Sequence, residues 1–313
     1  MPGETILLIG ASGQIGAELT MLLRSQYGNS NVIAADIKQA EGELFESGPF
    51  EVLNVLDKAG IAAVADKYRI TQIYNMAAML SATGEKFPQK AWQLNMDGLI
   101  NTLEIAREKG ISKMYWPSSI AAFGPTTPKV DTPQTTIMEP NTIYGISKQA
   151  GERWCEWYYL KYGLDVRSIR YPGIISYKTE PGGGTTDYAV DIYFKAKQTG
   201  KYTCYIAEDT LLPMMYMPDA IKATIQLMDA PADKIKIRSS YNLAAMTFSP
   251  KMVGAAIKKY IPDFELTYDI DFRQKIAETW PGSIDDSSAR SDWGWQHEYD
   301  LDKMTVDMLK HIK

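Results

Sequence analysis

The stretch that decides the fold covers residues 5–16 and reads Thr5-Ile6-Leu7-Leu8-Ile9-Gly10-Ala11-Ser12-Gly13-Gln14-Ile15-Gly16. Its apolar part, residues 5–9, predicts a strand that is buried on both faces. Gly10 permits a tight turn into a helix, Gly13 lets backbone approach a phosphate, and Gly16 lets the helix pack closely on the strand. The helix N-terminus offers free N–H groups and a partial positive charge. The stretch therefore predicts a site for the phosphates of a dinucleotide, the alternative being a tight turn without a ligand.

An acidic residue stands where such a site needs one. Residues 32–35 predict a second buried strand, and Asp36 ends it, 20 residues beyond Gly16. A carboxylate there accepts hydrogen bonds from the adenosine ribose hydroxyls and repels a 2′-phosphate, so NAD is favoured over NADP. The alternative is an aspartate that only caps a turn.

Strands and helices alternate through the first half of the chain. Further strands are predicted at 52–53, 72–75, 113–116 and 165–171, and helices at 61–68, 88–109 and 144–162. This alternation indicates an α/β fold with a doubly wound, Rossmann-type parallel sheet, in which ligands bind beyond the carboxyl ends of the strands.

The later chain is less regular. Helices are predicted near 218–229, 249–260 and 301–312, and Gly182-Gly183-Gly184 predicts a flexible loop. We expect residues 1–175 to form the dinucleotide-binding domain. Residues 176–313 should form a smaller α/β lobe that binds the substrate, with some segments returning to the first domain.

A tyrosine and a lysine are spaced for proton transfer. Tyr144 and Lys148 are four residues apart, which places them on one helix face. A nearby ammonium group lowers the pKa of a tyrosine from about 10, so that the phenolate can accept a proton from a substrate hydroxyl. Ser119 lies 25 residues before Tyr144, just past a strand, and Ser118 precedes it. A serine hydroxyl there can bind the reacting oxygen, although loop capping and a surface Tyr–Lys pair are the alternatives.

Composition disfavours several classes of function. The net charge is -5, which gives no electrostatic footprint for nucleic acid or an anionic membrane. No apolar run approaches the roughly 20 residues of a membrane span, and the N-terminus lacks the pattern of a targeting segment, so we expect a cytoplasmic protein. Two cysteines and two histidines supply no zinc motif, and no metal is expected.

These motifs together resemble a known family. The glycine motif, residues 117–124 and Tyr144-x-x-x-Lys148 are similar to those of the extended short-chain dehydrogenases/reductases, and the resemblance covers essentially the whole chain. It implies NAD as cofactor, a smaller C-terminal substrate lobe and a homodimer, with Ser119 as the catalytic hydroxyl. Phe123 stands where many members have tyrosine, at a position that is not catalytic.

Within that family the chain is most similar to the short-chain type of L-threonine 3-dehydrogenases, through residues 118–125, 170–176 and 183–188. This likeness implies L-threonine, a small molecule, as substrate. Expected cofactor-binding residues are Gly10, Gly13, Gln14, Ile15, Gly16, Asp36, Leu56, Asp57, Ala77, Ala78, Asn95, Tyr144, Lys148, Tyr171 and Ile174. Expected substrate-binding residues are Ser81, Ser118, Ser119, Tyr144, Gly184, Thr185, Thr186 and Trp280.

Two other functions stay open. A nucleotide-sugar epimerase or dehydratase of the same family needs basic residues for a diphosphate, and residues 177–212 contain lysines but no arginine. A non-enzymatic dinucleotide sensor would typically lack the Tyr–Lys pair, which this chain retains.

Overall fold

A parallel sheet forms the centre of the larger half of the molecule. The computed structural model describes residues 3–178 and 184–312. In these residues the central sheet has six strands in the order β3-β2-β1-β4-β5-β7, and every neighbouring pair is parallel. The strands are β1 (Ile6–Ile9), β2 (Val32–Asp36), β3 (Phe50–Val52), β4 (Gln72–Asn75), β5 (Lys113–Tyr115) and β7 (Asp165–Arg167). The predicted Rossmann-type fold is confirmed, and the order reverses beside β1, where such sheets bind ligands.

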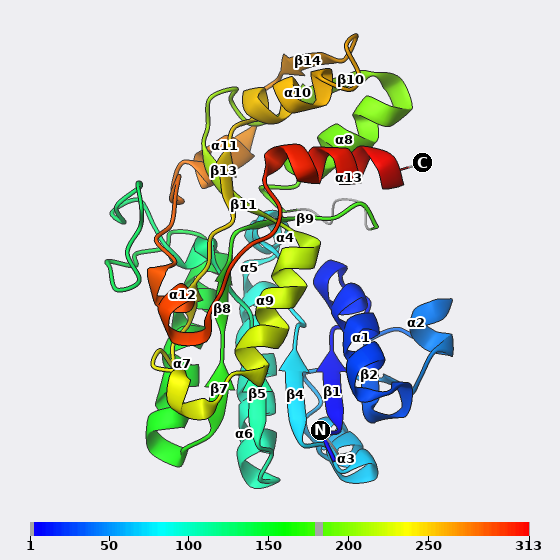
Figure 1. Ribbon diagram of the computed structural model, residues 1–313. Coiled ribbons are helices and arrows are strands. Elements are labelled where there is room, and N and C mark those ends of the chain that lie inside the picture. Colours follow the sequence, from blue (N-terminus) through cyan, green and yellow to red (C-terminus); the bar gives the residue numbers. More distant parts are fainter. Residues whose placement is uncertain (1–2, 179–183, 313) are drawn as a thin grey trace.

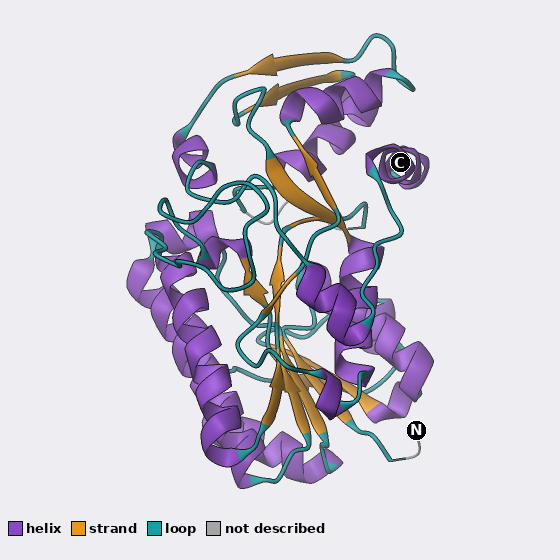
Figure 2. Cartoon of the chain, turned by 60° about the vertical axis from the view of Figure 1, so that its left-hand side comes forward, coloured by secondary structure: helices purple, strands orange, loops and turns teal. Residues whose placement is uncertain are grey.

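Helices cover both faces of this sheet (Figures 1 and 2). Ile6 and Leu8 of β1 pack into a core with helices α1 and α9, whereas Leu7 and Ile9 pack into a second core with α3, α6 and α7. Successive side chains of a strand point to opposite faces, so a continuous apolar run is what a doubly covered strand requires. The helices are α1 (Gln14–Tyr27), α3 (Lys58–Tyr68), α6 (Gly98–Glu108), α7 (Ile143–Tyr162) and α9 (Met217–Asp229).

The predicted helix over 88–109 is interrupted. It consists of α5 (Pro88–Trp92), a π-helical turn (Gln93–Asp97) and α6. Such turns insert an extra residue into a helix and frequently occur at functional sites. Two short helices that the sequence did not indicate, α2 (Glu43–Glu46) and α4 (Ser81–Lys86), lie in loops at the carboxyl ends of β2 and β4.

The predicted strand over 165–171 is wrong as one element. It breaks at Ser168, so that β7 completes the main sheet while β8 (Ile169–Tyr171) pairs with β6 (Ser118–Ser119) and with β12 (Tyr241–Asn242). The carbonyl of Ser168 accepts a hydrogen bond from the backbone N–H of Tyr241. Beyond Ser168 the chain therefore pairs with β12 rather than with the central sheet.

Most of the remaining elements build the upper half of Figure 1, whereas the helix over 287–293 lies in the lower half, where it contacts β12. A second small sheet has the order β13-β11-β9, and a third pairs β10 with β14. The strands are β9 (Gly173–Ile175), β10 (Lys201–Cys204), β11 (Leu212–Tyr216), β13 (Met246–Phe248) and β14 (Glu265–Tyr268). The helices are α8 (Tyr188–Thr199), α10 (Pro250–Lys258), α11 (Phe272–Ala277), α12 (Ser287–Trp293) and α13 (Leu301–His311).

The two halves are joined by more than the chain itself. Glu18 of α1 accepts a hydrogen bond from Ser176 (2.6 Å) and pairs with Lys178 (3.2 Å), just after β9. The domain boundary at 175/176 stays a prediction. Of the expected flexible loop, Gly182 and Gly183 lie outside the described residues. Among the helices in the described ranges, none has the length and apolar character needed to cross a membrane.

Candidate active site

The glycine loop forms one wall of a cleft at the carboxyl ends of the strands. Helix α1 begins at Gln14, and its N-cap is Gly13, which has no side chain to satisfy the first N–H groups. Gly10 has φ of +87°, and a Cβ there would lie 2.7 Å from the Ala77 nitrogen. A Cβ on Gly16 would lie 2.1 Å from the Gly10 carbonyl oxygen. Only glycine fits at these two positions, and the loop leaves backbone N–H groups for an anion.

Asp36 stands beside this loop at the end of β2. Its carboxylate accepts hydrogen bonds from the backbone N–H groups of Ser12 (2.9 Å) and Ile37 (2.7 Å). These bonds fix the carboxylate next to the glycine loop, and each oxygen keeps a further lone pair for a hydroxyl group. This is the arrangement that a ribose of a dinucleotide requires.

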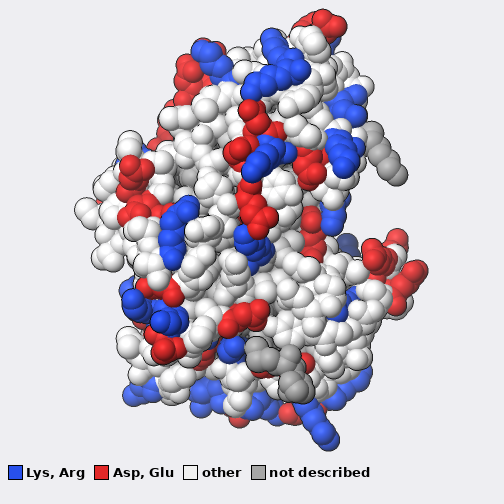
Figure 3. Space-filling view, viewed as in Figure 1, with Lys and Arg blue, Asp and Glu red and all other residues white. Residues whose placement is uncertain are grey.

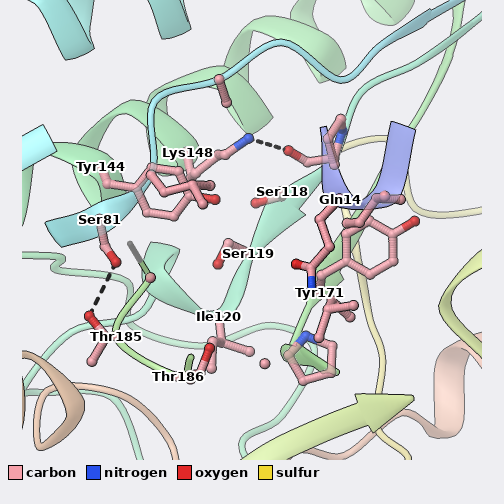
Figure 4. Close-up of a pocket in the computed structure, with 18 of the residues that line it drawn as sticks. Gln14, Ser81, Ser118, Ser119, Ile120, Tyr144, Lys148, Tyr171, Thr185 and Thr186 are labelled. Carbon is pink, nitrogen blue, oxygen red and sulfur yellow. Dashed lines mark hydrogen bonds between the residues drawn. The ribbon is translucent and has the colours of Figure 1, made fainter. Parts of the chain in front are cut away.

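Ser119, Tyr144 and Lys148 meet at the other end of the cleft (Figure 4). Ser119 lies at the end of β6, and α7 carries the other two residues. The Lys148 Nζ donates to the carbonyl of Pro117 (2.5 Å) and lies 4.4 Å from the centre of the Trp116 ring and 5.5 Å from that of Tyr144. The predicted catalytic residues are therefore close together.

Burial governs the protonation of both groups. It raises the pKa of Tyr144 to about 12, and a hydrogen bond with Ser119 offsets part of that rise. It lowers the pKa of Lys148 to about 7, against the attraction of Cys155 and Glu152. The expected lowering of the Tyr144 pKa by Lys148 is not found in this structure, because loss of water dominates and Nζ is directed at the Pro117 carbonyl.

Short polar side chains share the cavity, whose volume is about 240 Å³. Ser81 at the start of α4 and Thr185 are joined through their hydroxyl groups at 3.1 Å, and Thr186 lies beside them. Apolar side chains of Leu80, Ile120 and Trp280 also line the cavity. The cavity thus combines hydroxyl groups with a hydrophobic wall.

Most of the predicted site residues line this one cavity. Those that do are Gly10, Gly13, Gln14, Ile15, Gly16, Ala78, Ser81, Ser118, Ser119, Tyr144, Lys148, Tyr171, Ile174, Gly184, Thr185, Thr186 and Trp280. Five others do not line it: Asp36, Leu56, Asp57, Ala77 and Asn95.

These outlying residues have identifiable contacts. Asp57 caps α3 by accepting from the Gly60 N–H (2.9 Å), and Ala77 lies against Gly10. Asn95 lies in the π-helical turn, where its side chain accepts from the Met79 N–H (2.8 Å) and donates to the Met79 carbonyl and to Ser147. Asn95 therefore holds the β4–α4 loop against α7 from behind the cavity.

Comparison with known proteins agrees with this geometry. The family model of the NAD dependent epimerase/dehydratase family matches residues 6–244. The chain belongs to the NAD-dependent epimerase/dehydratase family. An uncharacterized epimerase/dehydratase of Staphylococcus saprophyticus is 53% identical over 312 residues, which cover 99% of this chain and 97% of the relative.

Solved structures of relatives are similar over nearly the whole chain. An L-threonine dehydrogenase from Cupriavidus necator in its holo form is 56% identical, with a TM-score of 0.97 and coverage of 99% of this chain and 100% of that one. A monomeric L-threonine 3-dehydrogenase from a metagenome is 46% identical, with a TM-score of 0.95 and coverage of 98% of both chains. As a member of this family the chain is an NAD-dependent enzyme, and its glycine loop and Asp36 fit that cofactor.

Sequence reasoning missed several side chains of the cavity. Leu80, Ile120 and Pro172 line it and adjoin predicted residues, so their place beside a motif was the available indication. Asp187 also lines it, and its carboxylate accepts from the Gly184 N–H (2.7 Å). Conversely, Ser118 lines the cavity but donates its hydroxyl hydrogen to Glu152 (2.6 Å), a residue that does not line it.

Proposed function

We propose that this protein oxidises the β-hydroxyl of L-threonine with NAD⁺, giving 2-amino-3-oxobutanoate and NADH. One observation carries the proposal: the cavity that holds Tyr144, Lys148 and Ser119 also holds a group of short hydroxyl side chains. Ser81, Thr185 and Thr186 are suited to the carboxylate and ammonium groups of a small amino acid. The hydrophobic wall is suited to the methyl group of threonine.

Four side chains of the cavity have defined tasks in this reaction. Ser119 donates a hydrogen bond to the substrate oxygen and orients it toward Tyr144. Tyr144 accepts the hydroxyl proton as the carbonyl forms. With a pKa of about 12 the phenolate is the minor form in this structure, and the positive charges of Lys148 and of bound NAD⁺ would increase its share. The glycine loop and Asp36 would hold NAD⁺, which would supply the acceptor for the hydride that leaves Cβ. Lys148 stabilises the phenolate and binds the nicotinamide ribose, while Trp280 excludes water from the reacting atoms.

The alternatives are less well supported by the cavity. Among the described residues that line it, Lys148 is the one cationic side chain, whereas a sugar diphosphate calls for additional donors such as arginine. A non-catalytic sensor would have no use for the buried Tyr–Lys pair.

We further propose a cytoplasmic homodimer that associates through α7. Exposed apolar side chains recur along one face of this helix at Ile146, Trp154, Trp157 and Leu160, with exposed fractions of 39%, 37%, 44% and 74%. Trp154, Trp157 and Leu160 follow one another at three-residue spacing, and Ile146 lies two turns earlier on the same side. We call these four residues the α7 ridge. Contiguous apolar surface of this kind marks protein interfaces, and a second copy would cover it symmetrically.

A substrate screen tests the activity. NADH formation is followed by absorbance with L-threonine, L-serine, 3-hydroxybutyrate and a uridine diphosphate sugar. L-threonine should exceed L-serine by roughly 10- to 200-fold in kcat/KM, because its methyl group enters an apolar site. Comparable rates with 3-hydroxybutyrate would show that the amino group is not recognised. Because an epimerase regenerates NAD⁺ in each turnover, the sugar nucleotide is analysed separately by proton NMR, and its interconversion would establish the epimerase alternative.

A further inference from the structure

One face of α7 carries a third polar residue in register with the first two. Glu152 lies four residues after Lys148 and eight after Tyr144, so all three lie on the same side of the helix. The sequence motif Tyr-x-x-x-Lys therefore extends to Tyr-x-x-x-Lys-x-x-x-Glu in this chain. Lys148 and Glu152 are both buried, with exposed fractions of 2% and 0%.

Three consecutive residues of the facing segment each contact one member of this set. The Pro117 carbonyl accepts from Lys148 at 2.5 Å and the Ser118 hydroxyl donates to Glu152 at 2.6 Å, while Ser119 faces Tyr144 across the cavity. Residues 117 and 118 are thereby attached to α7 at two successive points, which fixes the position of Ser119 beside Tyr144. A slip of this segment would move the Ser119 hydroxyl away from the phenol.

Glu152 is itself fixed from the opposite side. Arg170 of β8 donates to both carboxylate oxygens, with Nε at 2.9 Å and Nη2 at 2.7 Å. The remaining Arg170 nitrogen donates to the Gln134 carbonyl (3.0 Å) and to Asn242 (2.9 Å). A buried carboxylate has to be paired and hydrogen-bonded, and a bidentate arginine holds it in one orientation.

We propose that Glu152 is a positioning residue that holds residues 117–119 in register with Tyr144 and Lys148, and that Ser118 acts through Glu152 rather than on the substrate. This inference rests on the proposed function for its use of the Tyr–Lys pair. It reassigns Ser118, which the sequence predicted as a substrate contact. The direction of its hydroxyl explains the reassignment, because the hydrogen atom is committed to a carboxylate behind the cavity.

The same carboxylate acts on the charge of Lys148. Glu152 and Cys155 on α7 both favour the ammonium form, while burial opposes it. The other groups that face Nζ are the Tyr144 and Trp116 rings and the Pro117 carbonyl. Arg170 faces Glu152 and partly neutralises it. Removal of the Glu152 charge should therefore lower the pKa of Lys148 further below about 7.

Ser118→Ala separates the two roles of the serine. The variant leaves the Glu152–Arg170 pair intact, so it should fold, with a melting temperature lowered by a few degrees for the lost buried hydrogen bond. If Ser118 acts by position, kcat falls about 10- to 100-fold, the range expected for a small misplacement of reacting groups, while both KM values stay within about twofold. A rise in the KM for threonine with unchanged kcat would mean that Ser118 touches the substrate, and the proposal would be wrong.

Glu152→Gln and the double variant complete a cycle. The double variant should lose no more activity than Glu152→Gln alone, because both changes break one interaction. Additive losses would overturn the coupling. Glu104→Gln is the matched control, since it removes a carboxylate that binds Tyr158 of α7 and Arg107 without touching residues 117–119. If Glu152→Gln fails to fold, the Ser118→Ala result still decides the proposal.

A readout without substrate distinguishes failure of this inference from failure of the proposed function. The Lys148 side chain can be titrated by carbon-13 NMR of labelled lysine, with Lys148→Met for assignment. The midpoint should be lower in Glu152→Gln than in the wild type. Equal midpoints in two folded proteins would remove the electrostatic role of Glu152, whatever the substrate screen shows. If the wild type does not oxidise threonine, but the Lys148 midpoint is still lower in Glu152→Gln than in the wild type, only the proposed function is refuted.

Discussion

Tyr144 is the residue on which proton transfer depends. Its replacement by phenylalanine keeps the ring but removes the group that accepts the substrate proton. Turnover should fall by about 10² to 10⁴-fold, the usual contribution of a general base, while the Kd for NAD changes little. Steady-state rates and cofactor fluorescence titration measure the two quantities. Tyr260→Phe, at a half-exposed site in the turn after α10, serves as control, and turnover of Tyr144→Phe near that of wild type would exclude Tyr144 as the base.

Asp36 should set the choice between the two nicotinamide cofactors. Asp36→Ala removes the negative charge and the ribose hydrogen bonds, so affinity for NAD falls and discrimination against NADP is relaxed. Asp36→Asn keeps a hydrogen-bonding side chain without the charge, and should relax discrimination with a smaller loss of NAD affinity. The ratio of kcat/KM for the two cofactors is the measurement. An unchanged ratio in both variants would mean that Asp36 does not face the ribose.

For single residues, the sequence predicted which side chains lie close together in the site, but it did not predict their pKa values. Tyr144 and Lys148 lie in one helix, so their proximity follows from helical geometry alone. The pKa rise of Tyr144 comes from burial by segments distant in sequence, which no local spacing records. The commitment of Ser118 to Glu152 likewise depends on how β6 faces α7.

The turn from β1 into α1 is the element with the least tolerance for change. Gly16→Ala would place a Cβ 2.1 Å from the Gly10 carbonyl and 3.1 Å from the Ala11 Cα, both backbone atoms that cannot rotate away. The glycine loop should shift, and the Kd for NAD should rise at least tenfold (a loss of about 1.4 kcal/mol) together with a lower Tm. Calorimetric titration and thermal melting provide the test.

Gly84→Ala is the matched control for this element. It also adds a methyl group to a glycine within a helix near the cavity, but its nearest contacts are at 3.4 Å and involve side-chain methyl groups. It should leave the Kd for NAD unchanged. If Gly16→Ala bound NAD as well as Gly84→Ala does, the close packing of α1 would not support the phosphate site.

Elements were predictable where a local pattern was long enough. The strands and helices of the central sheet each follow from an apolar run or a helical period. The short strands β6, β8 and β12 have two or three residues, too few for any alternation to be visible. They exist because Ser118 pairs with Arg170 and Ile169 with Tyr241, partners 52 and 72 residues apart. For the same reason the break at Ser168 was not foreseen.

At the scale of the whole molecule, charged side chains of both signs are dispersed over most of one face, whereas exposed apolar side chains gather on α7. Over most of the face shown in Figure 3, basic and acidic side chains are interspersed, and basic side chains gather only along its lower edge. The α7 ridge is instead a gathering of aromatic and aliphatic groups, in which Trp157 packs against Trp154 (ring centres 5.8 Å apart) and Tyr162 (5.4 Å). Rings packed edge to face in this way have few rotatable bonds, so the surface loses little conformational entropy on association.

Trp157 lies in the middle of the α7 ridge, so its substitution tests whether the ridge is an interface. A homodimer should have about twice the 35.0 kDa mass of the chain in light scattering coupled to size exclusion. Trp157→Glu would bury a charge against apolar surface of the second copy, so the variant should elute as a monomer at concentrations where the wild type is dimeric. Val306→Glu, on exposed α13, is the control and should leave the mass unchanged. A relative of 46% identity is monomeric. A measured mass of about 35.0 kDa for the wild type would contradict the dimer. A Trp157→Glu variant that still doubles the mass would place the interface on another surface.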